Sequence, residues 1–280
     1  MKAIMVGAVF CALLGCAQEG ATRPSAAAQK TPEPSPDRRD FAATLAAGET
    51  VSIDNPYGDV RLRFGGYANA LEIHAVVQQP PGASEIAMQP VDDKTRYLFA
   101  PRLPAGALLA EGQRIDLVAF VPLGHAVVAS TEQGLIESRG VRGDVHLSSV
   151  AGDIAIRGTQ GRVQAVTGAG NIEASFDAAP PDSKQRLQTT TGNIVLAIDD
   201  HLDAALELAT SGVFATEFSL DVERLPGQEP NKRARAVVGA DEARVDIESR
   251  RGEIRLLRRS PFTSPGGKPV EQEQEDNDSD

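Results

Sequence analysis

Asp and Asn side chains that directly follow glycines are the residues whose type and spacing best suit chemistry. They are Asp144, Asp153, Asn171 and Asn193. Calcium-binding β-rolls carry a denser Gly-Gly-x-Gly-x-Asp repeat, whereas each turn here offers one glycine and at most one acid or amide. Asp153 is expected to stack on Asn171, which supplies one charge per pair. The spacing therefore favours hydrogen bonds that cap a turn over a calcium site, and we expect no bound metal.

The histidines show no metal-binding spacing. They are His74, His125, His146 and His201. None belongs to a His-x-x-x-His pair, and none has a carboxylate at a spacing that would complete a metal site. We expect all four to be solvated strand residues.

The sequence contains no recognisable catalytic motif. It lacks the Gly-x-Ser-x-Gly elbow of serine hydrolases. Polysaccharide cleavage on a β-helix would need a groove lined by acids and bases, with aromatic rings on which sugars can pack. The sequence has nine Phe and three Tyr, and we expect them not to cluster. We expect a protein that is not an enzyme and needs no cofactor, with a polysaccharide-active enzyme as a distant alternative.

The N-terminus has the layout of an export signal. Lys2 precedes an apolar run of about 12 residues, which is shorter than the roughly 20 residues of a spanning helix. The run ends in Leu13-Leu14-Gly15-Cys16, which resembles the bacterial lipobox. The resemblance implies that residues 1–15 are a signal peptide and that Cys16 receives fatty acyl chains such as palmitate. An ordinary signal peptide or a buried N-terminal helix is the alternative.

The lipid anchor would leave the mature chain without a thiol. Cys11 falls in the leader and Cys16 would carry lipid, so no cysteine remains for a disulfide, a metal or catalysis. No Asp directly follows Cys16. Asp at that position is the usual signal for retention in the inner membrane, so its absence favours the outer membrane.

Charge is distributed unevenly along the chain. The formal net charge is −11, and residues 271–280 hold six acids and no base. This balance disfavours nucleic-acid binding, because phosphate contacts require a basic face. A basic run near the C-terminus could bind anionic lipid or polysaccharide, pair with the acidic tail, or protect the open edge of the last strand; we favour edge protection. Its members are Arg250, Arg251, Arg255, Arg258 and Arg259.

Two flanking segments, residues 16–40 and 259–280, have the composition of disordered linkers. Between them, apolar and polar residues alternate, as in Thr50–Asp54 and residues 59–64 and 71–76. This period of two predicts half-buried β-strands rather than helices over residues 41–258.

An internal repeat dominates the second half of this body. Glycines recur nine residues apart at Gly134, Gly143, Gly152, Gly161 and Gly170, and the pattern continues at Gly192, Gly212 and Gly252. Every second glycine ends a unit of the form Val-x-(Leu/Ala/Ile)-x-(Ser/Thr)-x-x-Gly-x-Ile. The unit predicts an all-β fold, a single-stranded parallel β-solenoid with about 18–20 residues per coil, preceded by a less regular β region. An ordinary β-sandwich is the alternative.

We attribute the repeated glycines to tight turns that require a positive φ. Residues 221–242 interrupt the repeat and are predicted to be a loop insertion on one coil. Such a loop is either a tolerated surface insertion or the carrier of a function.

The repeat resembles the bacterial putative-adhesin family, a domain of unknown function with Gly-(Asp/Asn)-Ile turns after a Val-Pro entry. The resemblance rests on Val121-Pro122-Leu123-Gly124 through Gly170-Asn171-Ile172, and on Asn55-Pro56-Tyr57-Gly58-Asp59-Val60 near the start. It covers about residues 41–258. It implies a right-handed parallel β-solenoid and brings no catalytic residues.

These observations predict a lipid-anchored protein of the outer membrane that binds a polysaccharide or a protein partner and does not bind nucleic acid. An accessory or stress-related protein that faces the periplasm is the alternative.

Overall fold

The computed structural model describes residues 36–176, 179–199 and 202–259. The predicted signal peptide, Cys16 and the acidic tail lie outside the described residues. The described part consists of strands and turns without helices, and it therefore offers no helix long and apolar enough to cross a membrane. The described residues confirm the all-β prediction.

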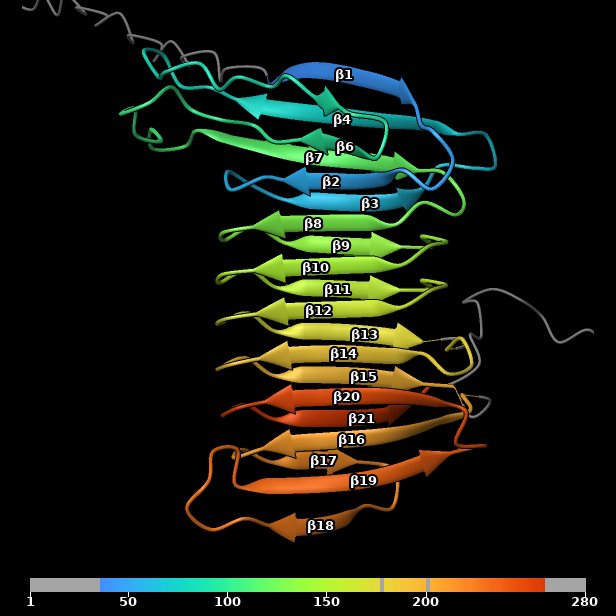
Figure 1. Cartoon of the computed structure of the whole chain (residues 1–280). Helices are drawn as coiled ribbons and strands as arrows, with labels where there is room; N and C mark the ends of the chain where they lie inside the picture. The colour runs from blue at the N-terminus through green and yellow to red at the C-terminus, as the bar shows by residue number, and fades with distance from the viewer. Residues whose placement is uncertain (1–35, 177–178, 200–201, 260–280) are drawn as a thin grey trace, which may run out of the picture. The chain divides into compact units, whose positions relative to one another are not determined.

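The strands form two mostly parallel sheets (Figure 1). Sheet A has, in spatial order, β1 (Asp37–Thr44), β4 (Ala70–Gln78), β7 (Arg114–Val121), β3 (Val60–Phe64), β9 (Ile136–Arg139), β11 (Ile154–Arg157), β13 (Ile172–Phe176), β15 (Ile194–Ile198), β21 (Ile254–Arg258) and β17 (Phe214–Thr216). Sheet B has β18 (Asp221–Arg224), β19 (Lys232–Val238), β16 (Ala204–Thr210), β20 (Ala243–Ser249), β14 (Lys184–Thr189), β12 (Val163–Thr167), β10 (Val145–Ser149), β8 (Val127–Thr131), β2 (Thr50–Asp54), β6 (Arg96–Phe99) and β5 (Val91–Asp92).

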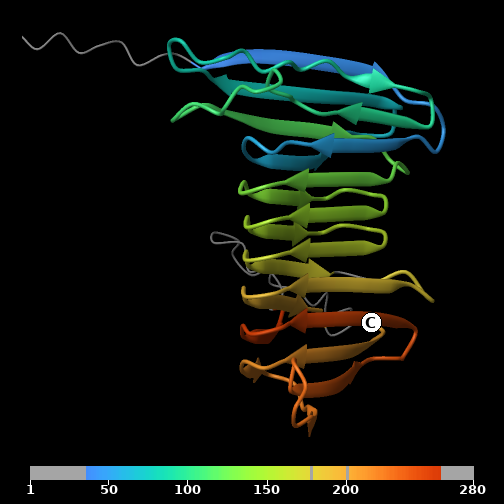
Figure 2. The same ribbon diagram turned by 60° about the vertical axis from the view of Figure 1, so that its left-hand side comes forward.

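The chain alternates between the sheets, and we call one strand of sheet B with the following strand of sheet A a rung. The rungs β8–β9, β10–β11, β12–β13 and β14–β15 follow one another in sequence and in space (Figures 1 and 2). Val127 pairs with Val145, and Val145 with Val163. The repeat of 18 residues therefore places equivalent residues side by side.

The core lies between the two sheets because alternate residues of every repeat are apolar. Ile136, Ile154 and Ile172 stack from sheet A, and Val145 and Val163 stack from sheet B; none is more than 1% exposed. Each such side chain contributes about 1.5–3 kcal/mol on burial. Stacking gives each rung the apolar neighbours that it could not supply alone.

The last repeats do not stack in sequence order, which corrects the simple succession of coils that we expected. The rung β20–β21 lies directly on β14–β15, and the earlier rung β16–β17 lies beyond it. The same departure occurs at the other end, where β2–β3 is inserted between β6–β7 and β8–β9. A strand can pair wherever a neighbouring edge is free, so sequence order does not determine position.

The loop predicted at residues 221–242 is instead largely a β-hairpin. Strand β18 pairs antiparallel with β19, and β19 pairs antiparallel with β16. Ala234, Ala236 and Val238 are buried at alternate positions, whereas Arg233 and Arg235 face outward. Charged outward residues hid this alternation, and the hairpin covers the edge of β16.

The predicted linker at residues 16–40 is too long at its C-terminal end, because β1 begins at Asp37. This strand pairs antiparallel with β4, and Phe41 packs edge-on against Phe99 with ring centroids 4.8 Å apart. The charged residues Asp37 to Asp40 made the segment resemble a linker, but an edge strand tolerates charge on its outward side.

Candidate functional site

A column of hydroxyl groups joins the rungs at the turn from sheet B to sheet A. Thr167 Oγ1 donates to the carbonyl of Gly152 on the preceding rung at 3.0 Å and accepts the N–H of Gly170 at 3.1 Å. Thr131, Thr189, Thr210 and Ser249 make the same two bonds on their rungs. The Ser or Thr of the repeat therefore satisfies backbone groups of two rungs at once.

The glycines of this column are required for a reason other than the one predicted. The positive-φ glycines include Gly161 but not Gly134, Gly143, Gly152, Gly170, Gly192 or Gly252. A Cβ at Gly152 would instead lie closer than 3.0 Å to the carbonyl oxygen of Gly134. A Cβ at Gly170 would lie similarly close to the carbonyl oxygen of Gly152. The column needs glycine because neighbouring backbones approach too closely for any side chain.

The second column, in the opposite turn, follows the same rule. A Cβ at Gly143 would meet the carbonyl of His125, and one at Gly161 the carbonyl of Gly143. Gly161 combines this close approach with a φ of 146°. The turn at Gly161 therefore needs glycine on both grounds.

The Asx residues cap the next rung and show no arrangement for calcium. Asp153 Oδ1 accepts the backbone N–H of Asn171 at 2.7 Å, and Asn171 Oδ1 accepts that of Asn193 at 2.9 Å. Asn193 Oδ1 continues to the N–H of Glu253 at 2.8 Å. Asp144, in the other turn, accepts the N–H of Arg162 at 2.9 Å. Across the described ranges, no group of three His, Cys, Asp or Glu could hold a metal ion.

The histidines do not share one environment, and the prediction of four solvated residues is wrong for His125. This side chain is 3% exposed, and its Nδ1 lies 2.8 Å from the carbonyl oxygen of Glu49. His74 lies on the surface with Nδ1 2.6 Å from Asp40, and His146 contacts Gln164 on the next rung. His201 lies outside the described residues.

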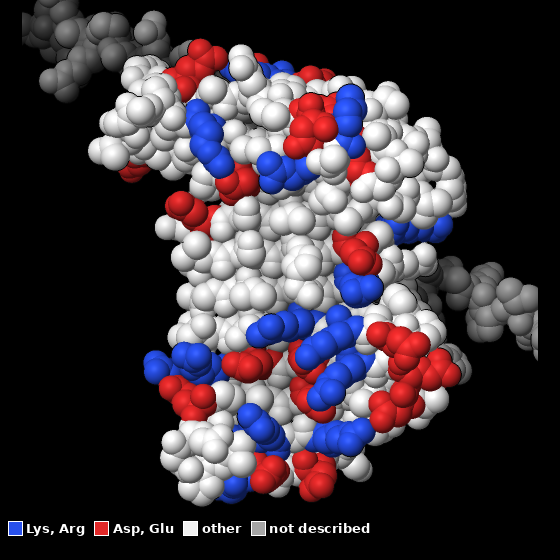
Figure 3. All heavy atoms as spheres, viewed as in Figure 1, with Lys and Arg blue, Asp and Glu red and all other residues white. Residues whose placement is uncertain are grey.

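The outward face of sheet B is divided into an uncharged half and a charged half. On β8, β10 and β12 the outward residues are Val128, Ser130, His146, Ser148, Gln164 and Val166. The face shown in Figure 3 carries few charges across the middle rungs and closely mixed charges of both signs below them.

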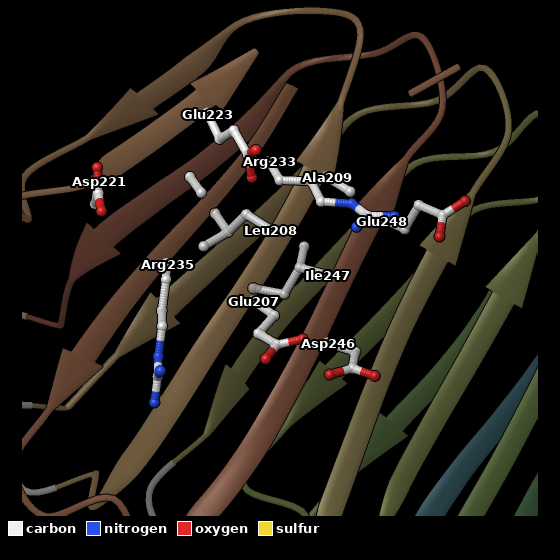
Figure 4. A pocket seen from close by; sticks show the side chains of 11 residues that line it. Glu207, Leu208, Ala209, Asp221, Glu223, Arg233, Arg235, Asp246, Ile247 and Glu248 are labelled. Carbon is white, nitrogen blue, oxygen red and sulfur yellow. The ribbon is translucent and has the colours of Figure 1, made fainter. Parts of the chain in front are cut away.

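A surface hollow of about 520 Å³ lies in the charged half, over β16, β18, β19 and β20. Figure 4 shows Arg233 extending over the small Ala209 toward Glu248. Several charged groups of this region are paired: Arg244 contacts Glu207, and Lys184 Nζ lies 2.6 Å from Asp246. The lining of the hollow has more acids than bases, and bases beside it pair with two of those acids.

The C-terminal arginines do not protect an edge, which corrects that interpretation. Strand β21 lies between β15 and β17. Arg251 Nε lies 2.7 Å from Glu229, Arg255 pairs with Glu253 at 2.9 Å, and the Arg258 guanidinium lies 4.6 Å from the ring centre of Phe218. Arg251 and Arg258 therefore contact the segments at Glu229 and Phe218, whereas the Arg255 pair is local.

The outward face of sheet A carries three arginines in one row. Arg63 on β3 pairs in register with Arg139 on β9, and Arg139 with Arg157 on β11. Arg63 forms an ion pair with Glu137 at 2.5 Å and Arg157 with Glu173 at 2.9 Å. Arg139 is exposed and has no hydrogen-bond or ion-pair partner among the residues that the structure describes.

An aromatic cluster adjoins this row, contrary to the prediction that aromatic residues do not cluster. Tyr67 is 72% exposed, and its ring stands edge-on to that of Phe64 at 5.5 Å. The Arg142 guanidinium lies 4.8 Å from the ring centre of Phe64, and Arg142 Nη1 donates to the Tyr67 hydroxyl at 3.2 Å. The cluster lies at the ends of β3 and β9, where Gly140, the residue after Arg139, lies beside Phe64.

A second hollow, of about 540 Å³, lies next to the row on the same sheet and includes Arg157 of the row in its lining. Its centre is over Ala155, whose small outward side chain leaves space between Glu137 and Glu173 on the neighbouring strands. Its other polar lining residues are Arg61, Arg157, Asp153 and Asn171. The second hollow is therefore lined by both hydrogen-bond donors and hydrogen-bond acceptors.

Sequence reasoning missed this surface, although a signal for it exists. Arg139 and Arg157 each stand three residues after the Ile of their repeat, and Arg63 stands three residues after Val60 in the outlying copy. The Phe64 and Tyr67 cluster has no such signal, because its partner Arg142 is 75 residues from Tyr67 along the chain.

The chain resembles known proteins in structure but matches none of the known families or curated proteins in sequence. No family model and no curated protein matches the chain. A solved structure described as a putative cell adhesion protein from Clostridium sporogenes matches with a TM-score of 0.46 and 12% identity, over 80% of this chain and 100% of that one. A structure described as a putative adhesin from Parabacteroides merdae matches with a TM-score of 0.27 and 10% identity, over 79% and 96%. The chain is thus similar, at low sequence identity, to structures described as adhesion proteins.

Proposed function

We propose that this protein is a non-enzymatic binding module of the cell envelope, anchored by lipid on Cys16 and displaying its strand stack to an extended partner. The observation that carries the proposal is the outward face of sheet A. Arg139 stands there, without a partner among the described residues and between two other arginines. The residue after it, Gly140, lies beside Phe64 of the cluster that contains the exposed Tyr67. Unpaired charge next to an exposed aromatic ring is typical of a surface that contacts a partner.

The body in this proposal is a right-handed parallel β-solenoid. The in-register pairing of β8, β10 and β12 and of β9, β11 and β13 supports a coil that advances by one strand spacing per repeat. The right hand is the usual chirality of parallel crossover connections.

An exposed apolar loop supports attachment at one end of the stack. Residues 105–110 contain no charged residue, Leu108 is 88% exposed and Leu109 is 45% exposed. Gly112, just after this loop, lines the same hollow as Pro36, where the chain from Cys16 enters the body. In this proposal the apolar loop inserts into the bilayer surface and adds to the anchoring energy of the lipid.

Membrane fractionation tests the anchor. The Cys16→Ala variant is expected in the soluble fraction, whereas the unaltered chain is expected with the membranes. A variant that stays with the membranes would refute the lipid anchor. Because the sequence has no Trp, Leu108→Trp introduces the only Trp, whose emission should shift to the blue with lipid vesicles. Val213→Trp, on the distant β16–β17 turn and 62% exposed before substitution, is the matched control and should not shift.

Protease treatment of intact cells decides between the two envelope roles. Digestion of the body while a periplasmic protein is spared would support a surface module. Protection until the outer membrane is permeabilised would support the periplasmic accessory role and would exclude adhesion to other cells.

A further inference from the structure

The arginine row of sheet A is unfavourable for the folded chain by itself. Neighbouring strands lie about 4.8 Å apart, and like charges directly opposite one another destabilise a sheet. Glu137 and Glu173 relieve Arg63 and Arg157, but no described residue relieves Arg139. A bound anion would remove this repulsion, so the row is better explained by a ligand than by stability.

The fixed spacing of the row determines the kind of anion. Three guanidinium groups at successive strand positions match carboxylates that recur along a chain, because each Arg can bind a carboxylate through two parallel hydrogen bonds. A single small anion would engage only one or two members of the row. The ligand is therefore a polymer with repeated acidic groups.

The surroundings of the row favour an acidic polysaccharide over a nucleic acid. Tyr67 presents an exposed ring, on which the apolar C–H face of a sugar can pack. The hollow over Ala155 offers Glu137 and Glu173 as acceptors for hydroxyl groups and Arg61 and Arg157 as donors. The phosphodiester backbone of DNA has no hydroxyl groups to donate to these carboxylates, whereas a polysaccharide does.

We propose that the outward face of β3, β9 and β11 binds an acidic polysaccharide, with uronate carboxylates on Arg63, Arg139 and Arg157 and a sugar ring on Tyr67. This inference rests on the proposed binding function and specifies its ligand class. In this arrangement the polymer runs along the stack, perpendicular to the strands.

Calorimetric titration with polygalacturonate tests the proposal on the full chain, purified in detergent from the cells that make it. Arg139→Gln is the decisive variant, because this side chain has no described partner whose loss would disturb folding. Loss of a charge-assisted contact should weaken binding about tenfold or more. Arg186→Gln is the matched control, since Arg186 is an exposed arginine on the outward face of sheet B, and it should leave the affinity unchanged. Tyr67→Ala should also weaken binding.

Three results would overturn the proposal. They are no measurable binding of polygalacturonate by the unaltered chain, equal weakening by the Arg139 and Arg186 variants, and tighter binding of duplex DNA than of polygalacturonate. Binding should also decrease with rising salt, because the contacts are ionic. If polygalacturonate does not bind but Cys16→Ala still releases the protein from membranes, the ligand class fails while the anchored module stands.

Discussion

Replacing Gly170 by Ala should destabilise the stack far more than a Gly-to-Ala change in an open turn. A Cβ at Gly170 would lie 2.0 Å from the carbonyl oxygen of Gly152, whereas carbon atoms pack best at about 3.5–4.0 Å. The two rungs would have to separate by more than about 1 Å, and overpacking of this kind commonly costs about 1–3 kcal/mol. The hydrogen bonds of Thr167 to both glycines would stretch as well, at about 1 kcal/mol each.

We therefore expect a loss of about 3–5 kcal/mol in the free energy of unfolding. Urea unfolding followed by far-ultraviolet circular dichroism measures it. Gly48→Ala is the matched control: Gly48 has a φ of 76° and no atom within 4 Å of the position that an added methyl group would take, so only backbone strain of about 1–2 kcal/mol applies. If Gly170→Ala costs no more than Gly48→Ala, the close-approach explanation of the glycine column is wrong.

Two further predictions concern the column and the arginine row. Thr167→Val keeps the side-chain shape but removes the hydroxyl group that joins Gly152 and Gly170, and it should lower the free energy of unfolding by about 2 kcal/mol. Ser148→Ala, at an exposed position, is the control and should change the free energy of unfolding by less than about 0.5 kcal/mol. Equal effects of the two variants in urea unfolding would contradict the bridging role of Thr167. Burial acts to raise the pKa of Glu137, but the hydrogen bond from Arg63 and the charges of Arg63, Arg61 and Arg157 outweigh it and hold the pKa below its ordinary value. A carboxylate whose pKa is lowered in the folded state stabilises the fold above its ordinary pKa, and this contribution is lost as pH falls through the lowered pKa. Glu137→Gln should therefore reduce stability at neutral pH, by an amount that shrinks as pH falls below the ordinary pKa of the carboxyl group. A constant difference across that range would refute this linkage.

The repeat itself could be predicted from sequence because it is local. A strict period of 18 residues with alternating apolar positions leaves one register for β8, β10 and β12, since a slip of one residue would turn every apolar side chain outward. The turn residues Asp153 and Asn171 were expected to stack, and they do. The role of glycine was misjudged, because φ is a property of one residue whereas close approach is a property of two rungs.

The order of the rungs and the candidate site were decided only by tertiary structure. The sequences of β20 and β21 do not determine that these strands pair with β14 and β15 rather than with β16 and β17 alone. Every strand of the repeat presents the same backbone hydrogen-bonding groups along its edge. The row of Arg63 and Arg139 exists only because β3 pairs with β9 across the intervening strands β4 to β8. Spacing along the chain determines which face a side chain occupies, but pairing between distant strands determines which side chains become neighbours.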